Sequence, residues 1–331
     1  MFSHWGVATL KRPLSMDIYH QWLNKDYHGK MEYLKTHAPL KEDPQALSPQ
    51  VKSAIVVAAP YLPHPHPMTT PLKQARVALY AQGGDYHYWL KAKLAELAEQ
   101  LRQQHPEHEF LCFTDSSPIL ERDLAFRAGL GWIGKNTCLI HPKKGSLFLL
   151  GEIYTSLPIT KEPSPLPDFC GKCTRCIEAC PTQAITQAKE LDARKCISYH
   201  TIESRELPPE NLREKMGDWL FGCDICQTVC PWNQKIFKNQ LEVLPKVNLN
   251  EDSQQSLIAD LRYILTSSGK KIERDFRGTA LARAGQFGLK RNALVVIANR
   301  QIRELSQEVE TLLEHPKLGS LATWTLEKLK T

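Results

Sequence analysis

Residues 170–185 read CGKCTRCIEACPTQAI, and the spacing of the cysteines in this stretch indicates how the middle of the chain folds. The pattern is C-x2-C-x2-C-x3-C followed by proline, and its cysteines are Cys170, Cys173, Cys176 and Cys180. This pattern is half of a bacterial ferredoxin that binds two [4Fe–4S] clusters. A second half is therefore expected elsewhere in the 331 residues.

The second half lies at 222–233, which read GCDICQTVCPWN. It has the same pattern without the first cysteine, because Leu220 stands at that position, and Cys196 is the only nearby replacement. In two-cluster ferredoxins the cysteine before proline ligates the other cluster. We therefore expect one cluster to be held by Cys170, Cys173, Cys176 and Cys230. The second cluster is expected on Cys180, Cys196, Cys223 and Cys226.

Two alternatives apply to these cysteines. Pairs of the form C-x2-C also build tetrahedral zinc sites, although such sites rarely show the spacing found here. The clusters would alternatively be purely structural, whereas two clusters that share crossed ligands lie close together, which favours electron transfer. The remaining cysteines, Cys112 in an apolar run and Cys138 after GKNT, are interpreted as packing residues.

Residues 1–165 have the pattern of an α/β domain. Short apolar runs at 53–59, 110–113 and 146–155 predict buried strands, and leucines at helical spacing predict an amphipathic helix over 88–104. Strands that alternate with helices favour a mostly parallel sheet. Ligands of such sheets bind beyond the carboxyl ends of the strands, which is where Asp115 lies in the sequence.

The segment after Asp115 carries helix and turn signals. Ser117 with a following proline is expected to begin a helix, and Gly129 to end it. The glycines of GLGWIGKN (129–136) permit close approach of a flat or phosphate-bearing ligand, but the spacing alone favours a helix end and a tight turn with Trp132 as packing. In DYHYW (85–89) a helix cap and a cofactor contact are both open interpretations.

The C-terminal part is basic over a limited stretch. From 262 to 303 there are ten Lys and Arg residues against two acids, and the apolar residues follow helical periods. A localised basic stretch is typical of nucleic-acid binding, and its simpler alternative is a solvated helix face. Serial short helices suggest one or two helical-repeat hairpins.

Composition sets the general class of protein. Hydrophobic residues make up 42% and charged residues 24%, the net charge is +6, and no apolar run approaches the roughly 20 residues of a membrane span. The N-terminus has neither an apolar signal core nor a twin arginine. We expect a cytoplasmic protein, in which ten cysteines are more readily metal ligands than disulfides.

Several strings together resemble the epoxyqueuosine reductase family, the cobalamin-dependent enzymes of tRNA queuosine synthesis. These strings are DYH (85–87), TDSSPILERDLAFRAGLGWIGKNT (114–137), the eight cysteines, LDARKCISYHTIE (191–203), GCDICQTVCPWN (222–233) and FRGTALARAGQFGLKRNALVVIAN (276–299). The resemblance implies a cobalamin-binding α/β (α+β) domain at 1–165 and a ferredoxin-like two-cluster module at 166–240. It also implies a short α-helical, HEAT-like repeat region that binds tRNA at 241–331.

The resemblance also implies an activity. Electrons from an external low-potential donor would pass through two [4Fe–4S] clusters to a base-off cobalamin. The epoxide of epoxyqueuosine, at the wobble position of the tRNA anticodon loop, would be reduced to an alkene by a monomeric enzyme. Asp115 matches the family's proton donor. That role requires burial to raise its pKa by several units from the ordinary value of about 3.9.

The resemblance assigns further residues by motif position. The expected cobalamin contacts are Asp85, His87, Asp115, Gly131, Trp132, Lys135, Asn136 and Ser198. The expected tRNA contacts are Lys270, Lys271, Arg274, Arg277, Lys290 and Arg291. Two rival functions are a cobalamin-dependent reductive dehalogenase and a two-cluster electron carrier without chemistry of its own, and neither has a use for the basic stretch.

Overall fold

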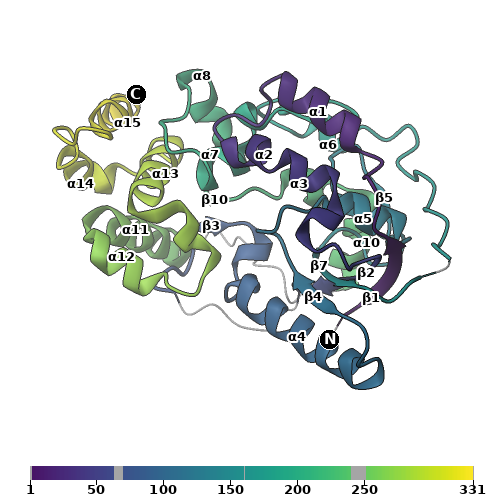
Figure 1. Cartoon of the computed structure of the whole chain (residues 1–331). Coiled ribbons are helices and arrows are strands. Elements are labelled where there is room, and N and C mark those ends of the chain that lie inside the picture. The colour runs from purple at the N-terminus through teal and green to yellow at the C-terminus, as the bar shows by residue number, and fades with distance from the viewer. Residues whose placement is uncertain (1, 63–69, 160, 240–250, 331) are drawn as a thin grey trace.

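The computed structural model describes residues 2–62, 70–159, 161–239 and 251–330 (Figure 1). A sheet with helices on both faces forms one side of the molecule, and the C-terminal helices form the other. Between them lies a region of short helices and strands that carries the cluster cysteines. The predicted boundary between 240 and 241 falls outside the described residues. No helix of the described chain has the length and apolar character needed to cross a membrane.

The main sheet has four strands in the order β1-β2-β7-β4. Their bounds are His4–Thr9 (β1), Ser53–Pro60 (β2), Phe148–Thr155 (β7) and Phe110–Phe113 (β4). The three predicted strands are confirmed, and β1 was not predicted. The parallel sheet was a wrong prediction, because all three pairings are antiparallel. β2 and β4 do run in the same direction, as two strands joined by a helix should, but β7 is inserted between them.

Helices cover both faces of this sheet. α4 (Tyr86–Gln104) packs on one face, where Leu90 and Leu94 meet Val57, and this confirms the predicted amphipathic helix. α5 (Glu121–Arg127) packs on the other face, against the side of Val56. Successive residues of a strand point to opposite faces of the sheet, so the apolar strand β2 contributes side chains to the hydrophobic cores on both faces. The N-terminal helices are α1 (Met16–Asn24), α2 (Glu32–Thr36) and α3 (Ala38–Glu42).

The segment that precedes α5 differs from the prediction. α5 begins at Glu121 rather than after Ser117, because the N–H of Ser117 donates to the carbonyl of Thr114 in a turn. Asp115 occupies this turn with a φ of 36°, a left-handed conformation that is uncommon for a residue with a side chain. Gly129 ends the helical segment with a φ of 74°, as predicted.

The cluster region contains only short elements. A hairpin of β5 (Trp132–Ile133) and β6 (Leu139–Ile140) precedes it, and β10 pairs in parallel with β3 (Arg76–Val77) from the first part of the chain. Its elements are α6 (Arg175–Glu178), β8 (Ile185–Gln187), β9 (Glu190–Leu191), α7 (Ile197–Ile202), α8 (Glu210–Arg213), β10 (Trp219–Phe221), α9 (Ile225–Thr228) and α10 (Pro231–Asn239).

The C-terminal helices share one hydrophobic core with the cluster region. Phe221 of β10 and Ile197 of α7 belong to the same buried cluster as Leu261 and Leu294. The two predicted domains are therefore not separated by independent cores. The helices are α11 (Glu251–Thr266), α12 (Gly269–Asp275), α13 (Gly285–Asn299), α14 (Ser306–Glu310) and α15 (Gly319–Lys330).

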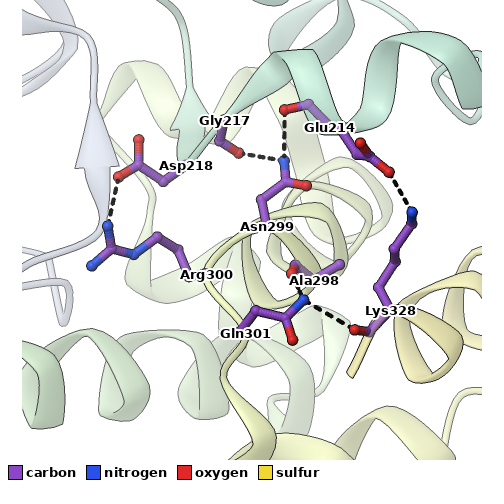
Figure 2. A pocket seen from close by; sticks show the side chains of 8 residues that line it. All are labelled: Glu214, Gly217, Asp218, Ala298, Asn299, Arg300, Gln301 and Lys328. Carbon is purple, nitrogen blue, oxygen red and sulfur yellow. Dashed lines mark hydrogen bonds and ion pairs between the residues drawn. The ribbon is translucent and has the colours of Figure 1, made fainter. Parts of the chain in front are cut away.

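A polar pocket marks the junction between the cluster region and the C-terminal helices (Figure 2). The side-chain amide of Asn299 donates to the carbonyls of Arg213 and Gly217, each at 2.8 Å, and Gln301 donates to the carbonyl of Lys328 at 3.0 Å. These contacts join the end of α13 to its neighbours. None of the predicted site residues lines this pocket, so its groups serve to hold the junction together.

Candidate active site

Seven of the eight predicted cluster cysteines fall into two neighbouring groups. In the first group Cys176 lies beside Cys170 and Cys230. In the second group Cys223 lies beside Cys180 and Cys196, and Cys226 lies beside Cys196 and Cys223. Each group thus combines cysteines from both halves of the sequence pattern, and Cys196 belongs to the group that it was predicted to complete.

Neither group of cysteines has the geometry of a site for a single metal ion. Among the described residues, no three His, Cys, Asp or Glu side chains approach closely enough to bind one ion. Four thiolates around a zinc ion each lie about 2.3 Å from it. The thiols of this region therefore suit multi-iron clusters better than zinc.

The segment 129–136 lies against the cluster region rather than at an open site. Trp132 is 1% exposed, and its indole N–H lies 3.5 Å from the sulfur of Cys170. Asn136 is 2% exposed and donates to the carbonyl of Cys226, while Lys135 donates to the carbonyl of Gly171. A Cβ on Gly131 would lie 2.4 Å from the carbonyl oxygen of Ile140.

The turn-and-packing interpretation of GLGWIGKN is thus the correct one. The assignment of Trp132 and Asn136 as side-chain contacts of cobalamin is wrong, because both side chains are enclosed by protein. Cys138, interpreted as packing, contacts the thiol of Cys226 and so adjoins the second group of cysteines. Cys112 packs with α4 and β4, as expected.

Asp115 lies at the centre of a polar cluster. Its carboxylate oxygen Oδ2 accepts hydrogen bonds from the Tyr86 hydroxyl at 2.5 Å and from Nε2 of His87 at 3.0 Å. Nδ1 of His87 contacts Asp85 at 2.7 Å, and Asp85 also caps α4 by accepting from the backbone N–H of His87. The cap interpretation of DYHYW is therefore confirmed, and Asp85 also orients the histidine beside Asp115. The cofactor contact stays a prediction.

The charges of this cluster are set by the hydrogen bonds between its members. Hydrogen bonds to Asp115 and then to Asp85 raise the pKa of His87 to about 9, so the imidazole is protonated at neutral pH. Burial is the largest single influence on Asp115 and opposes its ionisation. The hydrogen bonds from His87 and Tyr86 outweigh burial, so the pKa of Asp115 lies below its ordinary value. In the free protein the pKa of Asp115 is thus lowered and the proton resides on His87. The rise of this pKa was predicted for Asp115 beneath bound corrin and substrate, and for that state it stays a prediction.

Asp115 is accessible to a ligand. Its side chain is 54% exposed, although the surrounding protein partly desolvates the carboxylate. Ser198, which is half-buried, follows Cys196 at the start of α7. Arg283 is near enough for its charge to lower the pKa of Asp115, and it forms a 2.9 Å ion pair with Glu203.

The basic residues predicted to bind tRNA divide into two sets. Lys270, Lys271, Arg274 and Arg277 are exposed on and after α12. Arg291 is fully buried, and its guanidinium donates to backbone carbonyls, among them those of Ser204 at 2.6 Å and Glu206 at 3.0 Å. Lys290 is 9% exposed. The assignment of Lys290 and Arg291 as surface contacts is wrong, because a charge pattern does not reveal which side of a helix faces the core.

The exposed basic set adjoins the Asp115 cluster. The N–H of Asp85 donates to the carbonyl of Gly278 at 2.8 Å, and Gly84 forms a bridge with Thr279. The turn that carries Arg277 is therefore joined to the residue that orients His87. Sequence reasoning did not select four further residues at this site, namely Tyr86, Glu121, Glu152 and Arg283. For Glu152 a signal exists, since it is the only acid in the apolar run SLFLLGEIYT.

Comparisons with known proteins identify the family of this chain. Residues 169–233 match the family described as 4Fe-4S double cluster binding domain, and residues 41–116 match the family described as Epoxyqueuosine reductase QueG, DUF1730. The chain is 39% identical over 272 residues to the epoxyqueuosine reductase of Cyclobacterium marinum, covering 82% of this chain and 84% of that protein. It is 36% identical to that of Escherichia coli, covering 98% and 85%.

Solved structures give the same result for the fold. A crystal structure of epoxyqueuosine reductase with an epoxyqueuosine-modified tRNA-Tyr stem loop superposes with a TM-score of 0.82 at 26% identity, covering 100% of this chain and 87% of that chain. The Streptococcus thermophilus structure gives 0.81 at 26% identity, covering 99% and 86%. The chain belongs to the epoxyqueuosine reductase family.

Proposed function

We propose that this protein reduces epoxyqueuosine to queuosine in the anticodon loop of tRNA, with two [4Fe–4S] clusters and a bound cobalamin. The observation that carries the proposal is the exposed Asp115 carboxylate, paired with protonated His87 and joined to an exposed basic turn. A relative of the same fold was crystallised with an epoxyqueuosine-modified tRNA stem loop. Family membership disfavours the dehalogenase and the electron carrier.

Three parts of the chain would have separate roles in this reaction. Residues 1–165 would bind cobalamin and supply protons, 166–240 would transfer electrons from an external low-potential donor, and the repeat-like helices of 241–331 would bind tRNA. A cytoplasmic monomer suffices for these roles. Contacts from all three parts meet around Asp115, through His87, Glu203 and Arg283.

Cobalamin fits the surface around Asp115 on chemical grounds. Asp115 and half-buried Ser198 offer accessible polar groups, whereas Trp132 and Asn136 do not. Tyr86 and His87 border the same carboxylate, and the second group of cysteines begins α7 at Cys196. The cofactor, when bound in its base-off form, supplies a strongly reducing cobalt centre suited to opening an epoxide.

The protein itself supplies and positions a proton. His87 holds it at neutral pH, and Asp85 fixes the orientation of the imidazole. Asp115 accepts from Nε2 of His87 and is the group that faces outward, so the proton would reach the epoxide oxygen through Asp115. A general acid whose proton comes from a neighbouring imidazolium does not need a raised pKa of its own in the free protein.

The direct test is conversion of the substrate. The protein, purified without oxygen and loaded with iron, sulfide and cobalamin, should convert epoxyqueuosine in tRNA to queuosine when a low-potential reductant is added. Mass spectrometry of the digested tRNA would show the loss of one oxygen atom. Substrate that stays unchanged, with both clusters and cobalamin bound, would contradict the proposed function.

We further propose that the clusters have crossed ligands, as the two groups of cysteines suggest. Cys196→Ala is expected to lower the iron content from about eight toward about four atoms per chain, because one [4Fe–4S] cluster loses a ligand. Cys112→Ala is the matched control, since Cys112 packs against α4 and should leave eight. Full iron content and turnover in Cys196→Ala would show that another residue completes the cluster.

For tRNA binding we propose the exposed basic set. Lys271→Glu combined with Arg277→Glu should raise the KM for tRNA and make it less sensitive to salt. On single strands, each phosphate that the protein neutralises adds roughly −0.7 to the slope of log affinity against log salt concentration. Lys52→Glu, at the opposite end of the main sheet from Asp115, makes a charge change of the same kind and should have little effect. Equal KM values for the double variant and the parent would place the binding surface elsewhere.

A further inference from the structure

Behind Asp115 lie two glutamates that the proposed mechanism has not used. Glu152 of β7 is 0% exposed, and neither of its carboxylate oxygens has a hydrogen-bond donor. Buried polar atoms are rarely left without a partner, and a buried carboxylate without a donor is costly. The carboxyl groups of Glu152 and Glu121 interact directly, and between two such groups the only available donor is a carboxylic acid proton.

These two glutamates connect the interior to Asp115. Glu152 lies opposite Phe113 in the sheet, next to the loop that carries Asp115. Glu121, at the start of α5, accepts the backbone N–H of Asp115 through Oε1 and is only partly buried. The contact between Glu121 and Asp115 is made by the backbone N–H of Asp115, and the charge of the Asp115 carboxylate also acts on Glu121. The three carboxyl groups therefore lie near one another, from fully buried Glu152 through Glu121 to exposed Asp115.

The electrostatic surroundings keep a proton in this series. Burial, followed by the charge of Asp115, raises the pKa of Glu121 to about 8. Burial, followed by the charges of Glu121 and Asp115, raises the pKa of Glu152 as well. The other charged or titratable groups that face the pair are Lys41 of α3, Arg122 of α5 and Tyr154 of β7. The two cations lower the pKa of Glu121, but burial and Asp115 outweigh them.

We propose that Glu121 and Glu152 hold one proton between them at neutral pH and deliver it through Asp115 to the leaving oxygen. This inference rests on the proposed function. Reduction of the epoxide to an alkene breaks two C–O bonds, forms one C=C bond and releases water. The external donor supplies two electrons through the clusters. The oxygen needs two protons: the His87 imidazolium supplies the first and the glutamate pair the second.

The arrangement has a physical purpose. A tRNA loop bound over Asp115 would cover its exposed face and restrict water there, so the second proton is best stored inside the protein. After one turnover His87 is neutral and both glutamates are ionised. Solvent then restores the two protons when the product leaves. Glu121 and Glu152 act through Asp115, so they are positioning and proton-storing residues rather than catalytic ones.

The resting protein provides the first test. Infrared titration of the holoenzyme without tRNA should show a protonated carboxyl band that persists at pH 7 and disappears as the pH rises through about 8. Glu121→Gln combined with Glu152→Gln, which keeps the shapes of both side chains, should remove that band, whereas Glu99→Gln on the exposed face of α4 should not. Absence of the band from the parent would overturn the proposal, whether or not the enzyme is active.

The pH dependence of turnover provides the second test. The pair of Glu121 and Glu152 holds its proton below its pKa, so the parent should lose kcat as the pH rises through about 8. In the double variant Glu121→Gln, Glu152→Gln this loss of kcat near pH 8 should vanish, leaving a lower plateau that falls only near pH 9, where His87 loses its proton. KM for tRNA and iron content should stay at parental values. An unchanged pH profile in the double variant would overturn proton delivery, while a parent without turnover would instead contradict the proposed function.

Discussion

Asp115→Asn is expected to lower kcat by about 10²–10⁴-fold, the range by which general acid catalysis accelerates proton transfer. Asparagine preserves the shape of the side chain and can still accept hydrogen bonds from Tyr86 and His87. It cannot carry a proton from His87 to the substrate oxygen. Measured turnover of epoxyqueuosine-containing tRNA at saturating substrate would report the loss, because binding groups elsewhere are unchanged.

A second consequence separates proton transfer from simple structural damage. The hydrogen bond to Asp115 is the largest cause of the high pKa of His87, so Asp115→Asn should move the titration of His87 down from about 9. Nuclear magnetic resonance of the histidine ring would measure this shift. Asp43→Asn is the matched control, because Asp43 only caps a short helical turn by accepting from Gln45. Near-parental kcat in Asp115→Asn would show that another group protonates the oxygen.

Local sequence patterns were informative where the chemistry itself is local. The cysteine spacings predicted both halves of the cluster region, because ligands for a cluster must recur at short, fixed intervals. Strand and helix patterns in the first domain were also sufficient to locate β2, α4, β4 and β7. These patterns did not predict that the strands pair antiparallel, because the insertion of β7 between β2 and β4 depends on contacts between residues far apart in the chain.

Electrostatic properties were the least predictable from sequence. The pKa of Asp115 depends on Tyr86 and His87, which lie 29 and 28 residues earlier in the chain. Desolvation alone suggested a raised pKa, and only the fold shows that two donors reverse the direction. The prediction of tRNA contacts from the charge pattern of the C-terminal part was incomplete for the same reason. It assigned Arg277 and Arg291 the same role, although Arg277 is exposed and Arg291 is fully buried.

Arg291→Ala is expected to destabilise the folded protein by about 2–5 kcal/mol, as truncation of a large buried side chain does. Arg291 is the residue through which α13 holds the end of α7. Its guanidinium donates to the carbonyls of His200, Ser204 and Glu206, and to the side chain of Asn292. Truncation leaves those buried carbonyls without donors and opens a cavity, and both effects raise the free energy of the folded state.

Heating the cluster-loaded protein and following its helical circular dichroism would measure the effect. At roughly 2–4 °C per kcal/mol, the midpoint of Arg291→Ala should fall on the order of 10 °C. Arg277→Ala removes an exposed arginine of the same basic stretch and should leave the midpoint within about 2 °C, because surface substitutions change stability by about 0.5 kcal/mol or less. Arg291→Lys should recover only part of the loss, since an ammonium group cannot reproduce the planar fork of donors that reaches several carbonyls at once. If Arg291→Ala melted like the parent and bound tRNA more weakly, Arg291 would be a surface contact after all, and the buried network around α7 would have to be rejected.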